Sequence, residues 1–415
     1  MDSAKSLGAN ARASGQSLRG LDWFAFFVAD IQTGWGPFVA AYLTSVAWTQ
    51  LDIGFVLTIG TLAAFALQIP AGALVDRVPA KRFLVALAVT SISGSALLLA
   101  LWPTFGVVIV AKVLHAIASC LLGPALAAIS LGLVGHGLLS VRLGRNARFL
   151  SLGNAIAAGA MGGFGYYLSN RAIFFLTAAL CVPAFVALLQ IRSRDIDPDL
   201  ARGGVGASES SVPSYAFRNL VHNRALLIFA GAVLSFQFAN AAALPTMAGL
   251  LAKRMPETAT VILSICIFAP QLVVAAIAPW VGRQAQNWGR RPLLVLCFVA
   301  LSARCIIFAM TSDLYVVVAV QLLDGISAAT LGVLVPLVIA DVTRGSGHFN
   351  FAQGVVGAAV GIGASFSTTL TGFIADNGSA AAAFLFLAGV AAAGLILVVA
   401  FMPETRDGPA VPTNP

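Results

Sequence analysis

The feature that most constrains the fold is a series of twelve long apolar runs. A membrane-spanning helix needs about 20 predominantly apolar residues, and the runs are of about that length. They are too long for strands and lack the apolar–polar alternation that a transmembrane barrel requires. The sequence therefore predicts an all-α membrane protein with twelve transmembrane helices. The runs lie near residues 20–43, 52–75, 83–102, 104–134, 147–168, 171–191, 225–250, 259–281, 292–311, 314–340, 350–375 and 379–402.

The amino-acid composition excludes a water-soluble protein. Of the 415 residues, 59% are hydrophobic and only 10% are charged, whereas soluble domains carry about 25% charged residues. The first apolar run, residues 21–43, is longer than the ~7–15 residues of a signal-peptide core, so we expect it to remain attached as the first helix. The five cysteines all lie inside apolar runs, and we expect them to be core residues.

The net charge of +8 reflects basic loops rather than a nucleic-acid-binding surface. With the N-terminus inside, 19 of the 24 Lys and Arg residues fall in cytoplasmic segments. Because Lys and Arg concentrate in the cytoplasmic loops of membrane proteins, we predict that both termini are cytoplasmic and that nucleic acid is not a partner.

Two hydrophilic loops share one residue pattern at an offset of 210 residues. Each begins with a glycine at the end of an apolar run and ends with a basic pair, but the acid of the first copy is replaced by glutamine in the second. The two degraded copies together indicate a duplicated chain. The first comprises Gly72, Asp76, Arg77, Lys81 and Arg82, and the second comprises Gly282, Gln286, Gly289, Arg290 and Arg291.

A polar segment at residues 192–224 divides the twelve runs into six and six. We therefore expect an N-terminal bundle over residues 1–191, a cytoplasmic linker over 192–224 and a C-terminal bundle over 225–415. Within the linker, residues 213–220 have the composition of a short amphipathic helix at the inner membrane surface.

Both loop copies resemble the signature between spans 2 and 3 of the major facilitator superfamily, although Pro79 stands where that family usually has a second glycine. The resemblance covers about residues 20–403. Span 4 carries Lys-x-x-His-Ala at 112–116, similar to the family's Arg-x-x-x-Gly pattern with both anchors altered. Span 5 carries Gly-Ala-Met-Gly-Gly at 159–163, a partial match to the exporter signature that lacks its proline.

This resemblance implies a transporter in which two pseudo-symmetric six-helix bundles surround a central cavity lined by spans 1, 4, 7 and 10. It is closest in kind to bacterial drug and metabolite transporters, so we expect the bacterial inner membrane as the location. It also implies that the paired loops latch the outward-open state, with Asp76 bound to a cation of the opposite half. Gln286 cannot form such a pair, so we expect an asymmetric latch.

Five ionisable residues lie inside the predicted spans, where a charge costs about 2.5–3.5 kcal/mol on insertion scales. They are Asp30, Lys112, His115, Arg304 and Asp324. On the family fold, Asp30 would face Lys112 or His115, either as a proton or substrate site or as a static ion pair. Arg304 and Asp324 match in depth on adjacent antiparallel spans, so we expect a structural salt bridge, while Asp324 also remains a candidate cavity acid.

A second group of polar and aromatic residues supplies candidate contacts to a solute. Some intramembrane amides merely join helices, at ~0.6 kcal/mol per interhelical hydrogen bond, and others would line a cavity. The candidates are Gln32, Trp35, Gln237, Asn240 and Gln321.

The sequence contains no Walker loop, no His/Cys metal cluster and no nucleophile elbow, so we expect neither an enzyme nor a cofactor or metal. The leading hypothesis is a monomeric secondary transporter in the lipid bilayer that exports a small, partly apolar organic solute in exchange for protons. The alternative is uptake of an organic anion or metabolite by proton symport or uniport, with Lys112 and Arg304 as carboxylate partners. A membrane sensor would need a soluble output domain.

Overall fold

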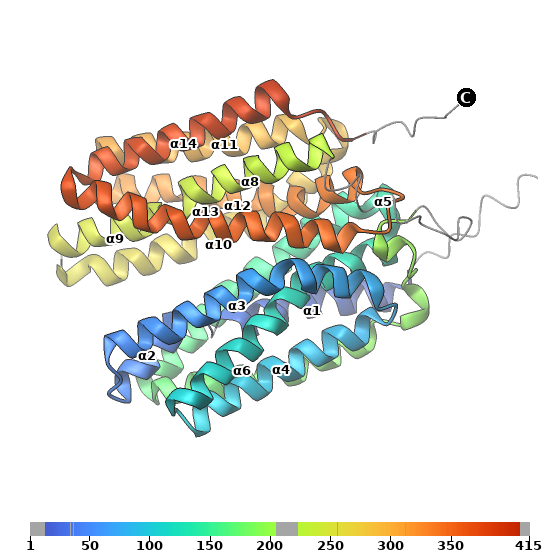
Figure 1. The fold of residues 1–415 in the computed structure, drawn as a ribbon, viewed down its shortest axis with the longest axis horizontal. Coiled ribbons are helices and arrows are strands. Elements are labelled where there is room, and N and C mark those ends of the chain that lie inside the picture. Colours follow the sequence, from blue (N-terminus) through green and yellow to red (C-terminus); the bar gives the residue numbers. More distant parts are fainter. Residues whose placement is uncertain are drawn as a thin grey trace, which may run out of the picture.

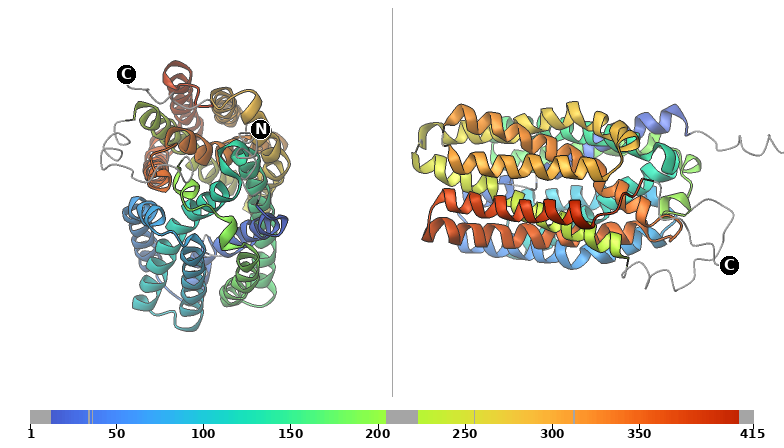
Figure 2. Two further views of the ribbon diagram at one scale, coloured as in Figure 1. Left: turned by 90° about the vertical axis from the view of Figure 1, so that its right-hand side faces the viewer. Right: turned by 90° about the horizontal axis from the view of Figure 1, so that it is seen from above.

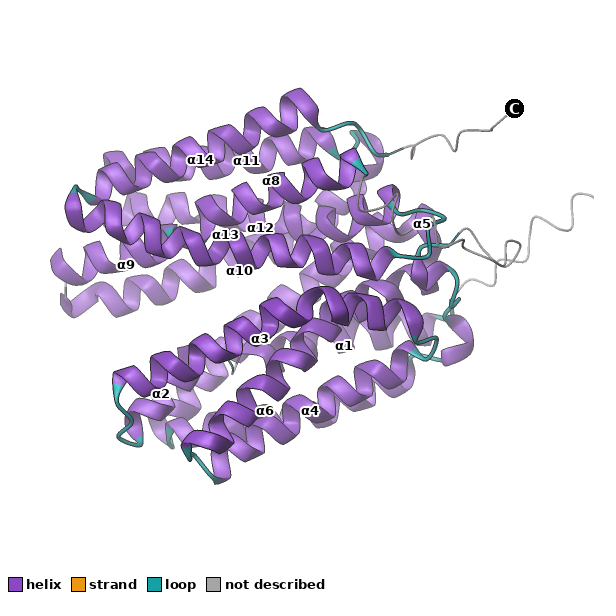
Figure 3. Cartoon of the chain, viewed as in Figure 1, coloured by secondary structure: helices purple, strands orange, loops and turns teal. Residues whose placement is uncertain are grey.

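A computed structural model describes residues 13–33, 35, 37–204, 223–254, 256–311 and 313–406 of the chain. Within these ranges the chain is almost entirely helical and contains no strand. Figure 3 shows the long helices, with loops confined to their ends. The predicted amphipathic helix at residues 213–220 lies outside the described residues.

The chain forms two sets of helices. The N-terminal half comprises α1 (Gly15–Thr33), α2 (Pro37–Ser45), α3 (Gln50–Arg77), α4 (Lys81–Leu101), α5 (Phe105–Tyr167) and α6 (Asn170–Gln190). Two short 3-10 turns follow, η1 (Ser193–Asp195) and η2 (Leu200–Arg202). The C-terminal half comprises α8 (Arg224–Ala241), α9 (Ala243–Arg254), α10 (Pro256–Asn287), α11 (Arg291–Met310), α12 (Leu314–Val342), α13 (Phe349–Asn377) and α14 (Ala380–Phe401).

These helices contain the twelve predicted spans. In the described part of the chain, ten helices are long and apolar enough to cross a membrane. One of them, α5, has 63 residues and contains both span 4 and span 5, with a sharp bend at Gly135 (φ +67°). The first span is divided between α1 and α2, which makes twelve in all.

The polar loop expected between spans 4 and 5, over residues 135–146, is instead helical after Gly135. Two of its basic residues explain the difference, because Arg142 and Arg145 both bind the buried Asp22 of α1. Arg142 also donates to Asn146 one turn later. Because Asp22 of the neighbouring helix balances the charge of these side chains, the segment can remain helical instead of forming a loop exposed to water.

The two halves form two bundles that lie close at one end of the molecule and diverge toward the other (Figure 1). We name the close end the Asp76 end, because α3 ends there. A view from this end shows the two bundles as separate groups of helices (Figure 2, left). The first and last described segments of the chain also lie here, since Ser14 binds Asp195 and Arg406 binds the carbonyl of Asn287.

Glycines allow helices of opposite halves to approach closely near the Asp76 end. A Cβ on Gly144 of α5 would lie 2.6 Å from the carbonyl oxygen of Ala278 in α10. A Cβ on Gly354 of α13 would lie 2.6 Å from the carbonyl oxygen of Gln68 in α3. These two glycines therefore let helices of opposite halves meet through backbone contact.

The predicted salt bridge between Arg304 of α11 and Asp324 of α12 is confirmed. The Arg304 side chain is 2% exposed, that of Asp324 is 24% exposed, and Arg304 also donates to Asn240 of α8. The pair therefore joins three helices of the C-terminal half.

We expect Asp324→Asn to lower stability strongly, because it leaves the buried Arg304 guanidinium without its counter-charge, a loss that typically costs about 3–5 kcal/mol. Arg304→Gln should cost less, because the Asp324 carboxylate left behind is less buried than the Arg304 guanidinium. Thermal unfolding of the purified variants in detergent measures both effects. A double variant whose loss equals the sum of the two single losses would contradict a coupled pair.

Candidate functional site

The two halves meet where the carboxylate of Asp76, at the end of α3, receives the first turn of α13. One oxygen, Oδ1, accepts from the backbone N–H of Asn350 (3.1 Å) and from its side-chain amide (2.8 Å). The other, Oδ2, accepts from the N–H of Phe351 (2.7 Å). The first N–H groups of a helix have no partner within that helix and carry partial positive charge, so a buried carboxylate stabilises them.

This contact corrects the expected cation partner for Asp76. Among the described residues no Lys or Arg of the opposite half forms an ion pair with it. The buried Lys81 turns back to its own half, where its ammonium donates to the carbonyls of Val75 and Asp76. The N-terminus of α13 therefore supplies the positive charge that the family pattern led us to expect from a Lys or Arg side chain.

Of the other residues of the first loop, only Gly72 directly supports this contact. Gly72 lies directly against the backbone of Asn350, so it admits α13 to this position. Arg77 is exposed, and Arg82 donates to the hydroxyl of Ser193 (2.6 Å).

The second loop copy makes mostly contacts within its own half. Arg290 is buried against Asp341 (Nε to Oδ2, 2.8 Å), and the backbone N–H groups of Arg290 and Arg291 donate to Glu404. Gly289 adopts φ +93°, which brings its backbone against the same carboxylate.

Only glutamine and glycine of the second copy reach the N-terminal half. The side-chain amide of Gln286 donates to the carbonyl of Gly137 (2.7 Å), at an exposed position. Gly282 packs against the backbone of Ser140. The expected asymmetry is therefore present: Asp76 is buried on a helix terminus, whereas Gln286 makes one exposed hydrogen bond.

The beginning of the linker is an ordered part of this assembly rather than a plain connection. We name residues 192–204 the strap. It docks on the N-terminal half, where Asp195 accepts from the hydroxyls of Ser14 and Ser17. These hydrogen bonds hold the pKa of the Asp195 carboxyl below its usual value. Further along, the N–H of Asp197 donates to the carbonyl of Gly132 in α5 (3.0 Å).

The far end of the strap contacts the C-terminal half. The carbonyl of Gly203 accepts from the N–H of Gly345 (2.6 Å), in the loop before α13. The carbonyl of Ala201 accepts from the side-chain amide of Asn350 (3.1 Å). Because the same amide nitrogen binds Asp76, Asn350 joins α3, α13 and the strap at one point.

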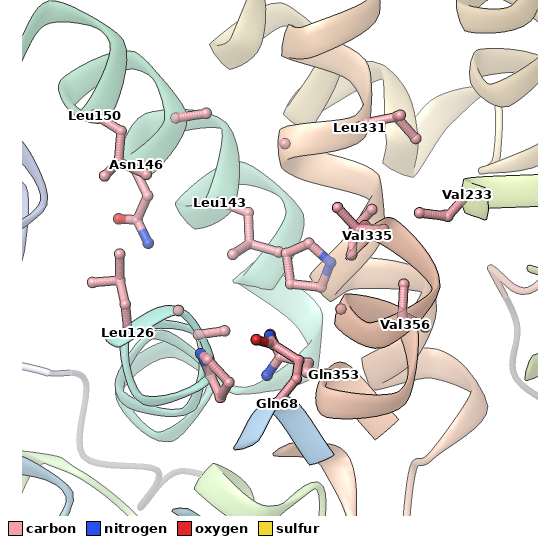
Figure 4. Close-up of a pocket in the computed structure, with 18 of the residues that line it drawn as sticks. Gln68, Leu126, Leu143, Asn146, Leu150, Val233, Leu331, Val335, Gln353 and Val356 are labelled. Atoms are coloured by element: carbon pink, nitrogen blue, oxygen red, sulfur yellow. The ribbon is translucent and has the colours of Figure 1, made fainter. Parts of the chain in front are cut away.

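A cavity of about 420 Å³ lies between the halves, lined by α3, α5, α8, α12 and α13. Its lining is mainly aliphatic, with four amides: Gln68, Asn146, Gln237 and Gln353. None of its lining residues is charged. Figure 4 shows the side chains of α5 and those of α12 and α13 facing one another across it, with Gln68 beside Gln353.

Two of these four amides are already engaged and two are free. Asn146 binds Arg142 and Ser130, and Gln353 donates to Asn350. Neither Gln68 nor Gln237 has a side-chain hydrogen bond to any other described residue, so both can bind a solute. Gln237 was predicted as a solute contact. Residues of spans 4, 7 and 10 line the cavity as expected, but none of span 1 does.

Outside the lining of the cavity, the predicted residues of spans 1 and 4 come together around the break between α1 and α2. The side-chain oxygen of Gln32 lies 3.0 Å from His115 Nε2 and accepts from Ser119 (2.9 Å). The rings of Trp35 and His115 stack at 4.2 Å, and Lys112 Nζ lies over the Trp35 ring at 5.6 Å. Ser119 was not predicted, although it follows His115 by one helical turn.

Asp30 does not join this group. It is 3% exposed, its Oδ1 has no hydrogen-bond partner, and it forms no ion pair with Lys112 or with any other described cation. Phe26 and Ala29, one turn and one residue earlier, lie against Gly153 of α5. Asp30 shares that face, which turns it away from span 4. The static pair between Asp30 and Lys112 was therefore a wrong interpretation.

In the C-terminal half, the candidate residues outside the latch other than Gln237 do not line the cavity. Asp324 and Asn240 both bind Arg304, so Arg304 is not a free cation for a carboxylate. Gln321 is 2% exposed and its Oε1 is buried without a partner. In the part of the chain that the structure describes, no three His, Cys, Asp or Glu residues gather as metal ligands.

Comparison with known proteins gives a consistent result. The family model of the Major Facilitator Superfamily matches residues 23–272 and 256–414. An uncharacterized MFS-type transporter of Mycobacterium tuberculosis is 41% identical over 391 residues, which are 94% of each chain. The class B tetracycline resistance protein of Escherichia coli is 33% identical over 105 residues, 25% of this chain and 26% of that protein.

Solved structures share the fold at low sequence identity. FucP, a major facilitator superfamily transporter in the outward conformation, superposes with a TM-score of 0.74 at 15% identity, covering 94% of this chain and 99% of FucP. The human organic anion transporter TETRAN superposes with a TM-score of 0.68 at 14% identity over the same shares. With the twelve spans and the paired loops, these matches show that the chain is a membrane transporter, not an enzyme, and that it belongs to the major facilitator superfamily.

Proposed function

We propose that this transporter exports a small, partly apolar organic compound across a bacterial inner membrane in exchange for protons. The observation that carries the proposal is the cavity between the halves, whose lining is aliphatic with two uncommitted amides and no charge. Such a lining favours an apolar solute that accepts or donates a few hydrogen bonds. We further propose that the protein acts as a monomer in the bilayer.

The basic loops favour a cytoplasmic location for the Asp76 end and for both termini. On this assignment, the contacts of Asp76, Asn350 and the strap hold the transporter closed toward the cytoplasm. Alternating access then requires these contacts to break as one bundle rocks against the other. The glycine contacts between α5 and α10 and between α3 and α13 would separate in the same movement.

Asp30 is the candidate proton carrier. A carboxyl group without an ion partner can gain or lose a proton without breaking a salt bridge, whereas Asp324 forms one with Arg304. Asp30 is buried in α1 beside the helix break before α2. A change in helix packing at this break can therefore alter the access of the Asp30 carboxyl group to water.

The test of the proposed function is transport by the purified protein in proteoliposomes, with an imposed proton gradient and a panel of labelled antibiotics and metabolites. We expect at least one partly apolar compound to move against its concentration gradient only when the gradient is imposed. Proton-independent transport of every compound that moves would overturn the exchange mechanism.

Asp30→Asn should abolish proton-driven transport while leaving exchange of the solute down its own gradient partly intact, because the amide cannot carry the proton. The comparison of driven uptake with solute–solute exchange in the same proteoliposomes measures the difference. Full gradient-driven transport by this variant would remove Asp30 from the coupling role and make Asp324 the next candidate.

Asp76→Asn should reduce transport about tenfold or more. It removes a charge that accepts three hydrogen bonds, and a hydrogen bond to a charged group contributes about 1.5–3 kcal/mol. Gln286→Glu should have a mild effect, because its one contact is exposed. Initial transport rates at equal protein amounts report both effects, and a parental rate for Asp76→Asn would refute the latch.

Gly132→Ala tests the strap separately from Asp76. A Cβ at this position would lie 2.8 Å from Ile196 and 3.1 Å from Ala201, so the strap must move off α5. Gly137→Ala is the matched control, because nothing lies within 4 Å of its Cβ. We expect only Gly132→Ala to open the Asp76 end more often.

The opening can be followed with a cysteine introduced at Gln353, which lines the cavity. A membrane-impermeant maleimide applied to inside-out vesicles should label it severalfold faster when Gly132 is replaced than in the Gly137→Ala control. Equal labelling rates in the two backgrounds would show that the strap does not restrain opening.

A further inference from the structure

Two hydrogen-bond donors of the N-terminal half lie buried next to each other without an acceptor. Lys112 is 9% exposed, and its side chain packs on Gly60 of α3, where a Cβ would lie 2.9 Å from Lys112 Cε. This packing directs the ammonium over the ring of Trp35. Trp35 is 5% exposed and its Nε1 has no hydrogen-bond partner.

The protein itself supplies no acceptor for this pair of donors. Within the described ranges no carboxylate lies at ion-pair distance from Lys112, and its ammonium has no hydrogen bond. The two buried acids of α1 are directed elsewhere: Asp22 binds Arg142 and Arg145, and Asp30 lies on the opposite face from Gln32. An unsatisfied buried donor is destabilising, and the contact with the ring offsets this only in part.

The position of the donors connects them with the cavity. Lys112, His115, Ser119 and Gly123 follow one another at intervals of three or four residues, so they lie along one face of α5. Gly123 lines the cavity, and His115 and Ser119 are partly exposed on the way to it. A molecule with an apolar body on this face can therefore direct one end toward Lys112.

We propose that Lys112 and the indole N–H of Trp35 bind an anionic acceptor group, such as a carboxylate, at one end of the transported solute. The ammonium provides the charge and the indole adds a directional hydrogen bond. Arg304, a buried cation of the C-terminal half, already has Asp324 and Asn240 as partners. The inference rests on the proposed transport of a partly apolar compound but is independent of its direction and of proton coupling.

The test compares binding of naphthoate with binding of its neutral analogue naphthamide to the purified full-length protein, by isothermal titration calorimetry in nanodiscs. Wild type should bind naphthoate more tightly than naphthamide. Lys112→Met should weaken naphthoate binding about tenfold or more and leave naphthamide binding unchanged, whereas Lys112→Arg should keep most of the affinity.

Trp35→Phe should weaken naphthoate binding severalfold, because it removes the N–H donor but keeps an aromatic ring over His115. Trp102→Phe is the matched control, since Trp102 is 57% exposed at the end of α4. Should Lys112→Met fail to fold, the arginine and phenylalanine variants still decide the question.

The proposal is overturned if wild type does not distinguish the two probes, if it binds neither, or if Lys112→Met weakens both equally. The binding measurement uses no proton gradient, so failure of the subsite can be distinguished from failure of proton-driven transport. Charge-selective binding together with failure of proton-driven transport would remove the exchange mechanism and keep the subsite.

Discussion

The structure depends on a carboxylate placed at the start of a helix that belongs to the other half of the molecule. The first N–H groups of α13 need an acceptor, and water is scarce where Asn350 is 0% exposed. Asp76 provides that acceptor only while the halves are together. When the halves separate, water must therefore hydrate both the Asp76 carboxylate and the first N–H groups of α13. This one contact couples the folding of α13 to the conformation of the whole transporter.

Backbone proximity makes this contact possible and the strap completes it. Gly72 lets Asn350 come within reach of Asp76, and Gly132 lets the strap lie flat on α5. The side-chain nitrogen of Asn350 has two hydrogens, and the structure uses one for Asp76 and the other for the carbonyl of Ala201. A substitution at either glycine would displace a partner of Asn350 and so act on the same closed state.

Sequence reasoning predicted the twelve spans, the paired loops and the Arg304–Asp324 bridge, because length, repetition and depth in the membrane can be read along a chain. It failed for Asp30, because depth in the membrane gives the position of a residue along the helix axis but not the side of the helix to which its side chain points. Asp30 and Gln32 differ by about 200° around α1 at 100° per residue, so Gln32 faces His115 while Asp30 turns away. Asn350 and the strap carry no motif, and only tertiary contact reveals them.

The buried polar groups of this protein are of two kinds, those paired within the protein and those left without a partner. In the C-terminal half Arg304 and Arg290 are each bound to an aspartate, and such pairs fix helices because breaking them leaves a charge unpaired. In the N-terminal half Asp30, Lys112 and Trp35 retain unused hydrogen-bonding groups. Groups left unsatisfied by the protein can respond to a proton or a solute at low energetic cost. Gln321 of the C-terminal half also keeps a buried oxygen without a partner, and Asp22 of the N-terminal half is paired with Arg142. Each half therefore contains pairs that fix its helices as well as groups that can respond.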